Sequence, residues 1–218
     1  GITAIDCQSV SINSASNTVT LTDNAIVIED CDFSDVGSTL TGADSASTTG
    51  ILGDDTNTVL TLNGTTISGY ATGVLKENGN LHMIGGSDIA GSDYGVYADS
   101  TSVYAIDASV DGGTAGTGLA VVDSPDVWVY PMDASGAIGM SVDDSPFRWD
   151  GGVVDATTAI SVVDSTGSVE NMTWSISTTQ INAGYNAHVT SIGNTLDDQR
   201  IVVDSTAIID EANILSVE

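Results

Sequence analysis

Aspartate residues recur at a regular spacing along the chain, and they are the first candidates for chemistry. Of the 30 acidic side chains, 25 are Asp, and four Asp-Ser turns lie roughly one repeat apart: Asp99, Asp123, Asp144 and Asp164. If these carboxylates stack at strand spacing, about 5 Å apart, they repel one another. Bound Ca²⁺ would relieve the repulsion with the four Asp as ligands. External salt would screen it, or each Asp would hydrogen-bond its own turn, and all three interpretations stay open.

A second group could bind a sugar. Tyr104, Trp128 and Arg148 follow three of these aspartates, five, five and four residues later. If Val103 and Val127 point inward, alternation along a strand directs Tyr104 and Trp128 outward. Arg148 would then lie over the rings in a cation–π contact. This strip predicts a carbohydrate-binding surface; the alternative is an aromatic patch that a loop or another subunit covers.

The two cysteines, Cys7 and Cys31, are 24 residues apart. If one repeat separates them, their Cα atoms lie within reach of a disulfide. A disulfide would place the protein outside the cytoplasm. The alternative is that both are small buried side chains of the core.

Few residues suit catalysis. His82 and His188 are about five repeats apart and do not meet in one site. Only Lys76, Arg148 and Arg200 are basic, whereas a polysaccharide lyase needs a basic residue beside its acidic ones. No nucleophile-elbow, zinc-protease or phosphate-loop motif occurs. We therefore expect no enzymatic activity and assign no catalytic residues.

Charge excludes several classes of function. Three basic residues against 30 acidic ones give a net charge of −27. Binding of nucleic acid requires Lys and Arg against phosphates, so no nucleic-acid partner is expected. No apolar run is long enough to span a membrane. With 41% hydrophobic residues the chain still has enough apolar side chains for a folded core.

Positioning of these residues depends on an internal repeat of about 22 residues. An apolar residue, four mostly small or polar residues and a second apolar residue recur; the second members are Val10, Phe33, Ile67, Ile89, Val110, Ala134, Val154, Trp174, Leu196 and Ile214. A small residue followed by an aliphatic one keeps the same period, as in Gly73-Val74 and Gly95-Val96. One gap of 34 residues contains the polar segment 37–50, which we interpret as a loop insertion. Strong helix formers are scarce, so each repeat is expected to form short strands and turns.

Such a unit resembles the right-handed parallel β-helix repeats of pectate-lyase-like folds and of large microbial surface proteins. Segments such as GVYADSTSVYAIDASVDGG and GLAVVDSPDVWVYPMDASG carry the resemblance. It implies an all-β, right-handed parallel β-helix of about ten coils. Residues 1–218 would then form one domain. The same scaffold carries enzymes, tailspikes and adhesins, so the resemblance leaves the function open.

From these features we expect an extracellular or cell-surface structural module: a stalk, an adhesin, a surface layer or a filament subunit. Neither end of the chain offers an evident capping helix, so we expect end-to-end self-association or continuation in a longer chain. The alternatives are a lyase or glycoside hydrolase acting on an anionic glycan, and a carbohydrate-binding module.

Overall fold

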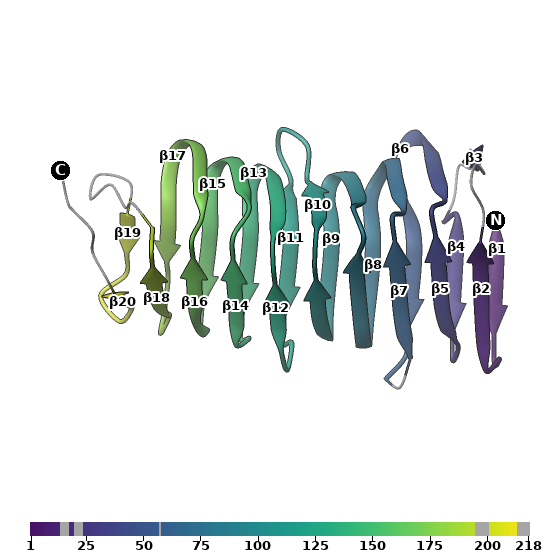
Figure 1. Cartoon of the computed structure of the whole chain (residues 1–218), viewed down its shortest axis with the longest axis horizontal. Coiled ribbons are helices and arrows are strands. Elements are labelled where there is room, and N and C mark those ends of the chain that lie inside the picture. Colours follow the sequence, from purple (N-terminus) through teal and green to yellow (C-terminus); the bar gives the residue numbers. More distant parts are fainter. Residues whose placement is uncertain (14–17, 20–23, 57, 195–200, 213–218) are drawn as a thin grey trace.

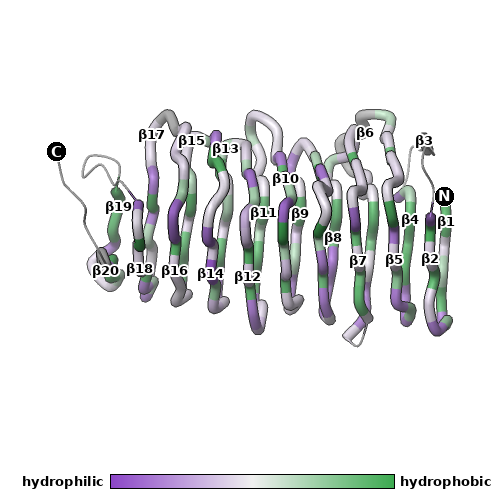
Figure 2. The backbone as a smooth tube through the Cα atoms, in the orientation of Figure 1, coloured by the Kyte–Doolittle hydropathy of each residue, from purple (hydrophilic) through white to green (hydrophobic). Residues whose placement is uncertain are grey.

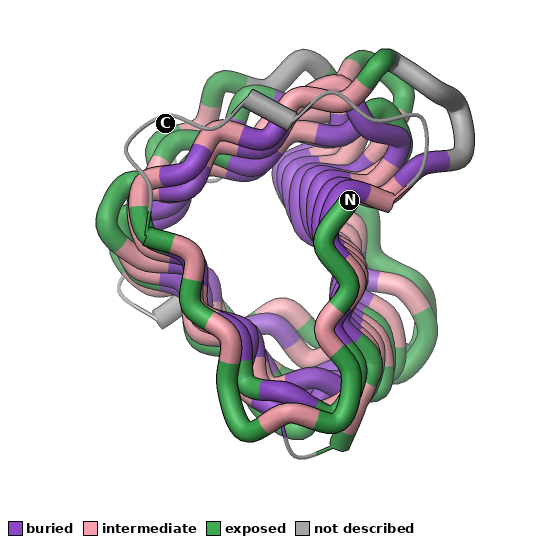
Figure 3. The backbone as a smooth tube through the Cα atoms, turned by 90° about the vertical axis from the view of Figure 1, so that its right-hand side faces the viewer, coloured by how far each residue is buried: buried purple, intermediate pink, exposed green. Residues whose placement is uncertain are grey.

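The computed structural model shows a parallel β-solenoid, or β-helix, built from twenty strands and no helix in the described residues, which are 1–13, 18–19, 24–56, 58–194 and 201–212. Successive turns of the chain stack along one axis from the N-terminus to the C-terminus (Figure 1). Seen along that axis, the turns superimpose around a common centre (Figure 3). No described helix could cross a membrane.

Each turn of the solenoid has three faces, which we name A, B and C. Apart from the strands at the two ends, each strand pairs in parallel with the strand one turn earlier and one turn later on the same face, as β14 does with β12 and β16. The described residues complete eight turns with all three faces, against the ten expected, and the period of about 22 residues is confirmed.

The strands divide among the faces as follows. Face A contains β2 (Ser9–Asn13), β5 (Asp32–Val36), β7 (Val59–Asn63), β12 (Val127–Val129), β14 (Phe147–Asp150), β16 (Thr166–Glu170), β18 (His188–Ile192) and β20 (Ile208–Ala212). Face B contains β3 (Thr18–Val19) and β10 (Ala108–Asp111), and face C contains β1 (Ile2–Ile5), β4 (Ile26–Glu29), β11 (Thr117–Val122) and β19 (Ile201–Val203). Longer strands bend from B to C: β6 (Thr39–Asp54), β13 (Met132–Asp143), β15 (Val153–Val163) and β17 (Thr173–Ala183). Two continue onto face A, namely β8 (Thr66–Ile84) and β9 (Ser87–Ala105).

Aliphatic ladders fill the interior, because inward positions of neighbouring strands stack in register. Apolar segments recur at corresponding places in successive turns (Figure 2). The small-then-aliphatic marker is one such ladder on face C, fully buried throughout: Ile51, Val74, Val96, Leu119, Met140 and Ile160. The preceding glycines are required by close approach, since a Cβ on Gly73 would lie 2.6 Å from the carbonyl oxygen of Gly95.

The first repeat marker, the pair of apolar residues separated by four others, includes positions from two different faces. Val10 pairs with Phe33 on face A, whereas Ile67 stacks on Leu40 of face B. The 34-residue gap therefore does not measure one turn. Leu196 and Ile214, the last two positions of that marker, lie outside the described residues.

Segment 37–50, expected as a loop, lies mostly in strand β6. The true spacing from Phe33 to its partner Leu60 is 27 residues, compared with 21 from Leu60 to Leu81. Four of the six extra residues are taken up by register shifts between Thr41 and Thr49. The other two lengthen the turn after β6, so the insertion is smaller than expected and is distributed along the turn.

A disulfide joins Cys7 and Cys31, with their Cα atoms 5.0 Å apart. It links the first turn of the solenoid to the second, at the corner between the strand pairs β1–β4 and β2–β5. A cross-link at this place limits fraying of the first turn, because a solenoid's end turn has a neighbour on one side only.

Candidate functional site

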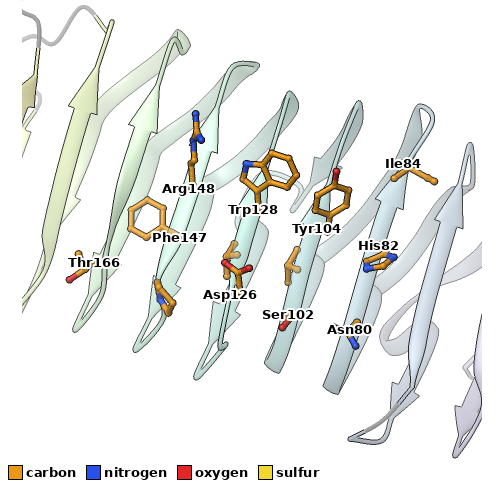
Figure 4. A pocket seen from close by; sticks show the side chains of 13 residues that line it. Asn80, His82, Ile84, Ser102, Tyr104, Asp126, Trp128, Phe147, Arg148 and Thr166 are labelled. Carbon is orange, nitrogen blue, oxygen red and sulfur yellow. The ribbon is translucent and has the colours of Figure 1, made fainter.

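Face A carries a groove of about 760 Å³ midway along the solenoid. Its walls come from five consecutive turns: the ends of β8 and β9, strand β12, strand β14, and the start of β16. Figure 4 shows the side chains that line it (Asn80, His82, Ile84, Ser102, Val103, Tyr104, Asp126, Val127, Trp128, Pro146, Phe147, Arg148 and Thr166). Concave surfaces with apolar walls and a few polar groups are typical of ligand sites.

An aromatic row forms the floor of the groove. His82, Tyr104 and Trp128 occupy the same position in three neighbouring strands, as the register pairs His82 with Tyr104 and Tyr104 with Trp128. They point outward because their neighbours Val103 and Val127 are buried in the core, which confirms the predicted alternation. The ring centroids of Tyr104 and Trp128 are 4.7 Å apart, and those of His82 and Tyr104 are 5.7 Å apart.

Trp128 is partly accessible to solvent, with 37% of its surface exposed. It differs in this from Trp149, which lies one position beyond Arg148 and is fully buried. The ring of Trp128 lies against Tyr104 on one side and leaves a face open to the groove (Figure 4). Trp128 is exposed while His82 and Tyr104 are half-buried, so the row is a candidate binding surface.

Arg148 continues the same row, since it pairs in register with Trp128. Its guanidinium binds Glu170 through Nε–Oε1 and Nη2–Oε2 distances of 3.1 Å, and Asp150 through an Nη2–Oδ2 distance of 3.2 Å. The two carboxylates are mostly buried, and they hold the guanidinium in place. The expected cation–π contact over the rings is therefore replaced by a charge pair with these two acids.

Several polar side chains along the groove remain free to bind a ligand. Asp126 precedes Trp128 by two residues and therefore lies on the same side of the chain. Within the described part of the chain, its carboxylate has no hydrogen-bond or ion-pair partner, and the same holds for the side chains of Asn80 and Ser102. The groove thus combines aromatic faces with unused donors and acceptors at its edge.

The aspartates of the Asp-Ser turns lie at a different place, where face C turns into face A. Asp123, Asp144 and Asp164 each adopt a positive φ, between 43° and 50°, which Asp tolerates better than most residues. Asp99 does not belong to this row: it pairs with Val122, one residue earlier, and Ser100 takes the positive-φ position instead. The four aspartates therefore do not form one ladder.

Serine in these turns has a separate role. The side chains of Ser124, Ser145 and Ser165 are buried and form a column of their own. The Ser145 hydroxyl accepts from the Ser124 N–H at 2.8 Å, and the Ser165 hydroxyl accepts from the Ser145 N–H at 3.0 Å. Three of the four Asp-Ser pairs are thus explained by backbone geometry at Asp and by a buried Ser side chain, and Asp99-Ser100 is the exception.

Mutual repulsion still affects the exposed carboxylates. Partial desolvation, and then the charges of Asp144 and Asp99, raise the pKa of Asp123 above its ordinary value. Near the N-terminus, a hydrogen bond and charge repulsion from Asp55 raise the pKa of Asp30 to about 6. No group of three or more His, Cys, Asp or Glu side chains in the described ranges is arranged to hold a metal ion. Ca²⁺ binding by Asp99, Asp123, Asp144 and Asp164 stays a prediction without structural support.

Two buried charged residues were not expected from the sequence. Lys76 is 1% exposed, and its Nζ donates to the backbone oxygens of Asp55 and Glu77 and to the Thr58 hydroxyl, at 3.1 to 3.2 Å. Burial lowers the pKa of Lys76. Asp35 is fully buried and accepts hydrogen bonds from the hydroxyls of Ser38 and Thr65. Both occupy strand positions where alternation alone would predict apolar side chains, so periodicity could not identify them.

Comparison of the chain with protein-family models, with curated proteins and with solved structures finds no match. The groove itself is therefore the basis for assigning a function. Its floor offers flat apolar rings, and its edges offer a carboxylate, an amide and hydroxyls. That arrangement suits a ligand with apolar faces and a polar rim.

Proposed function

We propose that the protein is an extracellular structural β-solenoid module of a cell-surface protein, of the adhesin kind, which binds a glycan in the groove on face A. A sugar ring has an apolar face that stacks on aromatic side chains and hydroxyls around its rim that need hydrogen-bond partners. The carrying observation is the row of His82, Tyr104 and Trp128, with the free side chains of Asn80, Ser102 and Asp126 beside it.

A binding role is favoured over a catalytic one by the charge pairs in the groove. Among the residues that line it, Arg148 is the only Lys or Arg, and two carboxylates hold its guanidinium. A lyase acting on an anionic glycan needs a basic group free to meet the substrate. The acids Asp150 and Glu170 are likewise engaged with Arg148. These contacts position a wall of the groove and leave Asp126 as the one lining carboxylate among the described residues, whereas a glycoside hydrolase needs a pair of them.

An extracellular location is supported by the Cys7–Cys31 disulfide, since structural disulfides persist outside reducing compartments. A net charge of −27 keeps such a rod soluble and disfavours nucleic acid as a partner. Within the described residues, β1 pairs only with β4 and β20 only with β18, so each keeps an open backbone edge. These edges support the proposal of end-to-end stacking, or of continuation in a longer chain.

Glycan-array binding by the wild-type protein and by Trp128→Ala tests the proposed function. We expect wild type to retain a subset of glycans and Trp128→Ala to lose them, because stacking on the exposed indole disappears. Tyr185→Ala is the matched control, since Tyr185 is 57% exposed and does not line the groove. Far-ultraviolet circular dichroism of all three proteins checks that the solenoid is intact. Binding that survives in Trp128→Ala, or no glycan binding by wild type, would refute the proposal.

A further inference from the structure

We infer that the glycan bound in the groove carries positive charge, as an oligosaccharide of amino sugars with free ammonium groups does. The inference rests on the proposed function and adds the ligand's chemical class. It follows from the charges that line the groove and from which of them already have partners.

Positive charge in the groove is neutralised within the protein. Arg148 has its Nε and Nη2 donors directed at Glu170 and Asp150, so one guanidinium faces two carboxylates. A uronate or sulfated sugar that approached the guanidinium would also meet these two carboxylates. The same contacts leave this end of the groove with net negative charge, which opposes an anionic ligand.

The negative charge in the groove, by contrast, has no partner within the described part of the protein. Asp126 lines the groove beside Trp128 and has no side-chain partner among the described residues (Figure 4). A ligand ammonium here would meet the carboxylate and the open face of the indole together. Aromatic faces attract cations, Trp most strongly, and Tyr104 adds a second ring 4.7 Å away. An excess of 27 negative charges over the whole chain would also speed the approach of a cationic ligand.

A glycan fits this site better than a lysine-rich peptide does. The polar groups at the groove edge include the hydroxyls of Ser102 and Thr166 and the amide of Asn80, which match a ligand rich in hydroxyls. The floor is a continuous row of rings that follows the solenoid axis across three turns. Such a row suits consecutive sugar rings, whereas a lysine side chain would use one ring.

The experiment uses three oligosaccharides of equal length: glucosamine (cationic), N-acetylglucosamine (neutral) and galacturonate (anionic). Binding to the full chain is measured by isothermal titration at mildly acidic pH. The variant Asp126→Asn keeps the shape of the side chain and removes its charge. Asp155→Asn removes the same charge from an exposed residue on strand β15 of face B, away from the groove, and is the matched control.

We expect the glucosamine oligomer to bind most tightly and the galacturonate oligomer not to bind. Asp126→Asn should weaken glucosamine binding about fivefold, as expected for one partly exposed charge pair, and should weaken N-acetylglucosamine binding clearly less, because the amide keeps a hydrogen-bond acceptor but no charge. Asp155→Asn should leave both unchanged. Equal weakening by both variants, or a preference for the neutral or anionic oligomer, would overturn the inference.

Two further outcomes separate the inference from the proposed function. If Trp128→Ala abolishes binding of a neutral glycan while Asp126→Asn has no effect on any oligomer, the glycan function stands and the charge assignment falls. If a lysine-rich peptide binds as tightly as the glucosamine oligomer and is equally sensitive to Trp128→Ala, the sugar assignment falls.

Discussion

Replacing Ser145 with alanine tests the structural explanation of the Asp-Ser turns. The Ser145 side chain is 2% exposed, accepts from the Ser124 N–H at 2.8 Å, and donates to the Asp143 oxygen at 2.8 Å. In Ser145→Ala the Ser124 N–H keeps no acceptor, and a buried donor without a partner costs about 1–3 kcal/mol. The Asp143 oxygen still accepts from the Asp123 N–H at 3.1 Å, so losing the hydrogen bond from the Ser145 hydroxyl costs little at that oxygen. We therefore expect a decrease of about 2 kcal/mol in the free energy of unfolding.

Ser124→Ala provides an internal comparison for this prediction. Its hydroxyl is equally buried and donates to the Val122 oxygen at 3.2 Å, but no described backbone N–H donates to it. Its removal orphans no donor, so the cost should be about 0.5–1 kcal/mol. Ser175→Ala, on an exposed residue, should change stability by less than about 0.5 kcal/mol.

Urea unfolding followed by circular dichroism measures all three variants, with the midpoint and the slope fitted separately. The order Ser145→Ala, Ser124→Ala, Ser175→Ala in decreasing cost is the expected result. Equal costs for Ser145→Ala and Ser124→Ala would show that the serine column does not stabilise the turns.

Two pH-dependent effects follow from the perturbed groups. Burial lowers the pKa of Lys76 below 10.5, so between the folded and unfolded pKa values the unfolded chain binds a proton that the folded chain lacks. The free energy of unfolding of the wild type should therefore rise with pH in this range. Lys76→Met should abolish the rise in alkaline urea titrations, and an unchanged slope of stability against pH would contradict the prediction. Asp55 raises the pKa of Asp30 to about 6, so the folded chain binds the extra proton and stability should fall as pH rises from about 4 through 6. Asp30→Asn should remove that fall, and a decline of equal size in the variant would assign it to other groups.

Repeat spacing predicted the fold because a solenoid repeats the same burial in every turn. The Gly-aliphatic marker identified a real ladder, since a Cβ on Gly95 would collide with the Gly118 oxygen one turn later. The apolar marker was less informative, because Phe33 and Ile67 are both buried but belong to different faces. Periodicity in sequence identifies a buried position without saying which face it belongs to.

The candidate site was partly predictable for the same reason. Tyr104 and Trp128 could be placed side by side from alternation and period alone. The partners of Arg148 could not, because Glu170 comes from the next turn and its approach depends on side-chain geometry. Lys76 and Asp35 are buried through hydrogen bonds to turns and hydroxyls, which a hydropathy pattern does not encode.

The most direct test of the proposed function is a nuclear magnetic resonance titration of the isotope-labelled protein with whichever of the three oligosaccharides binds most tightly. The account predicts that the largest amide shifts fall on the groove, at His82, Tyr104, Asp126 and Trp128, and that the Trp128 indole resonance moves with them. Shifts concentrated on face B or face C, with these four residues unmoved at saturation, would contradict it.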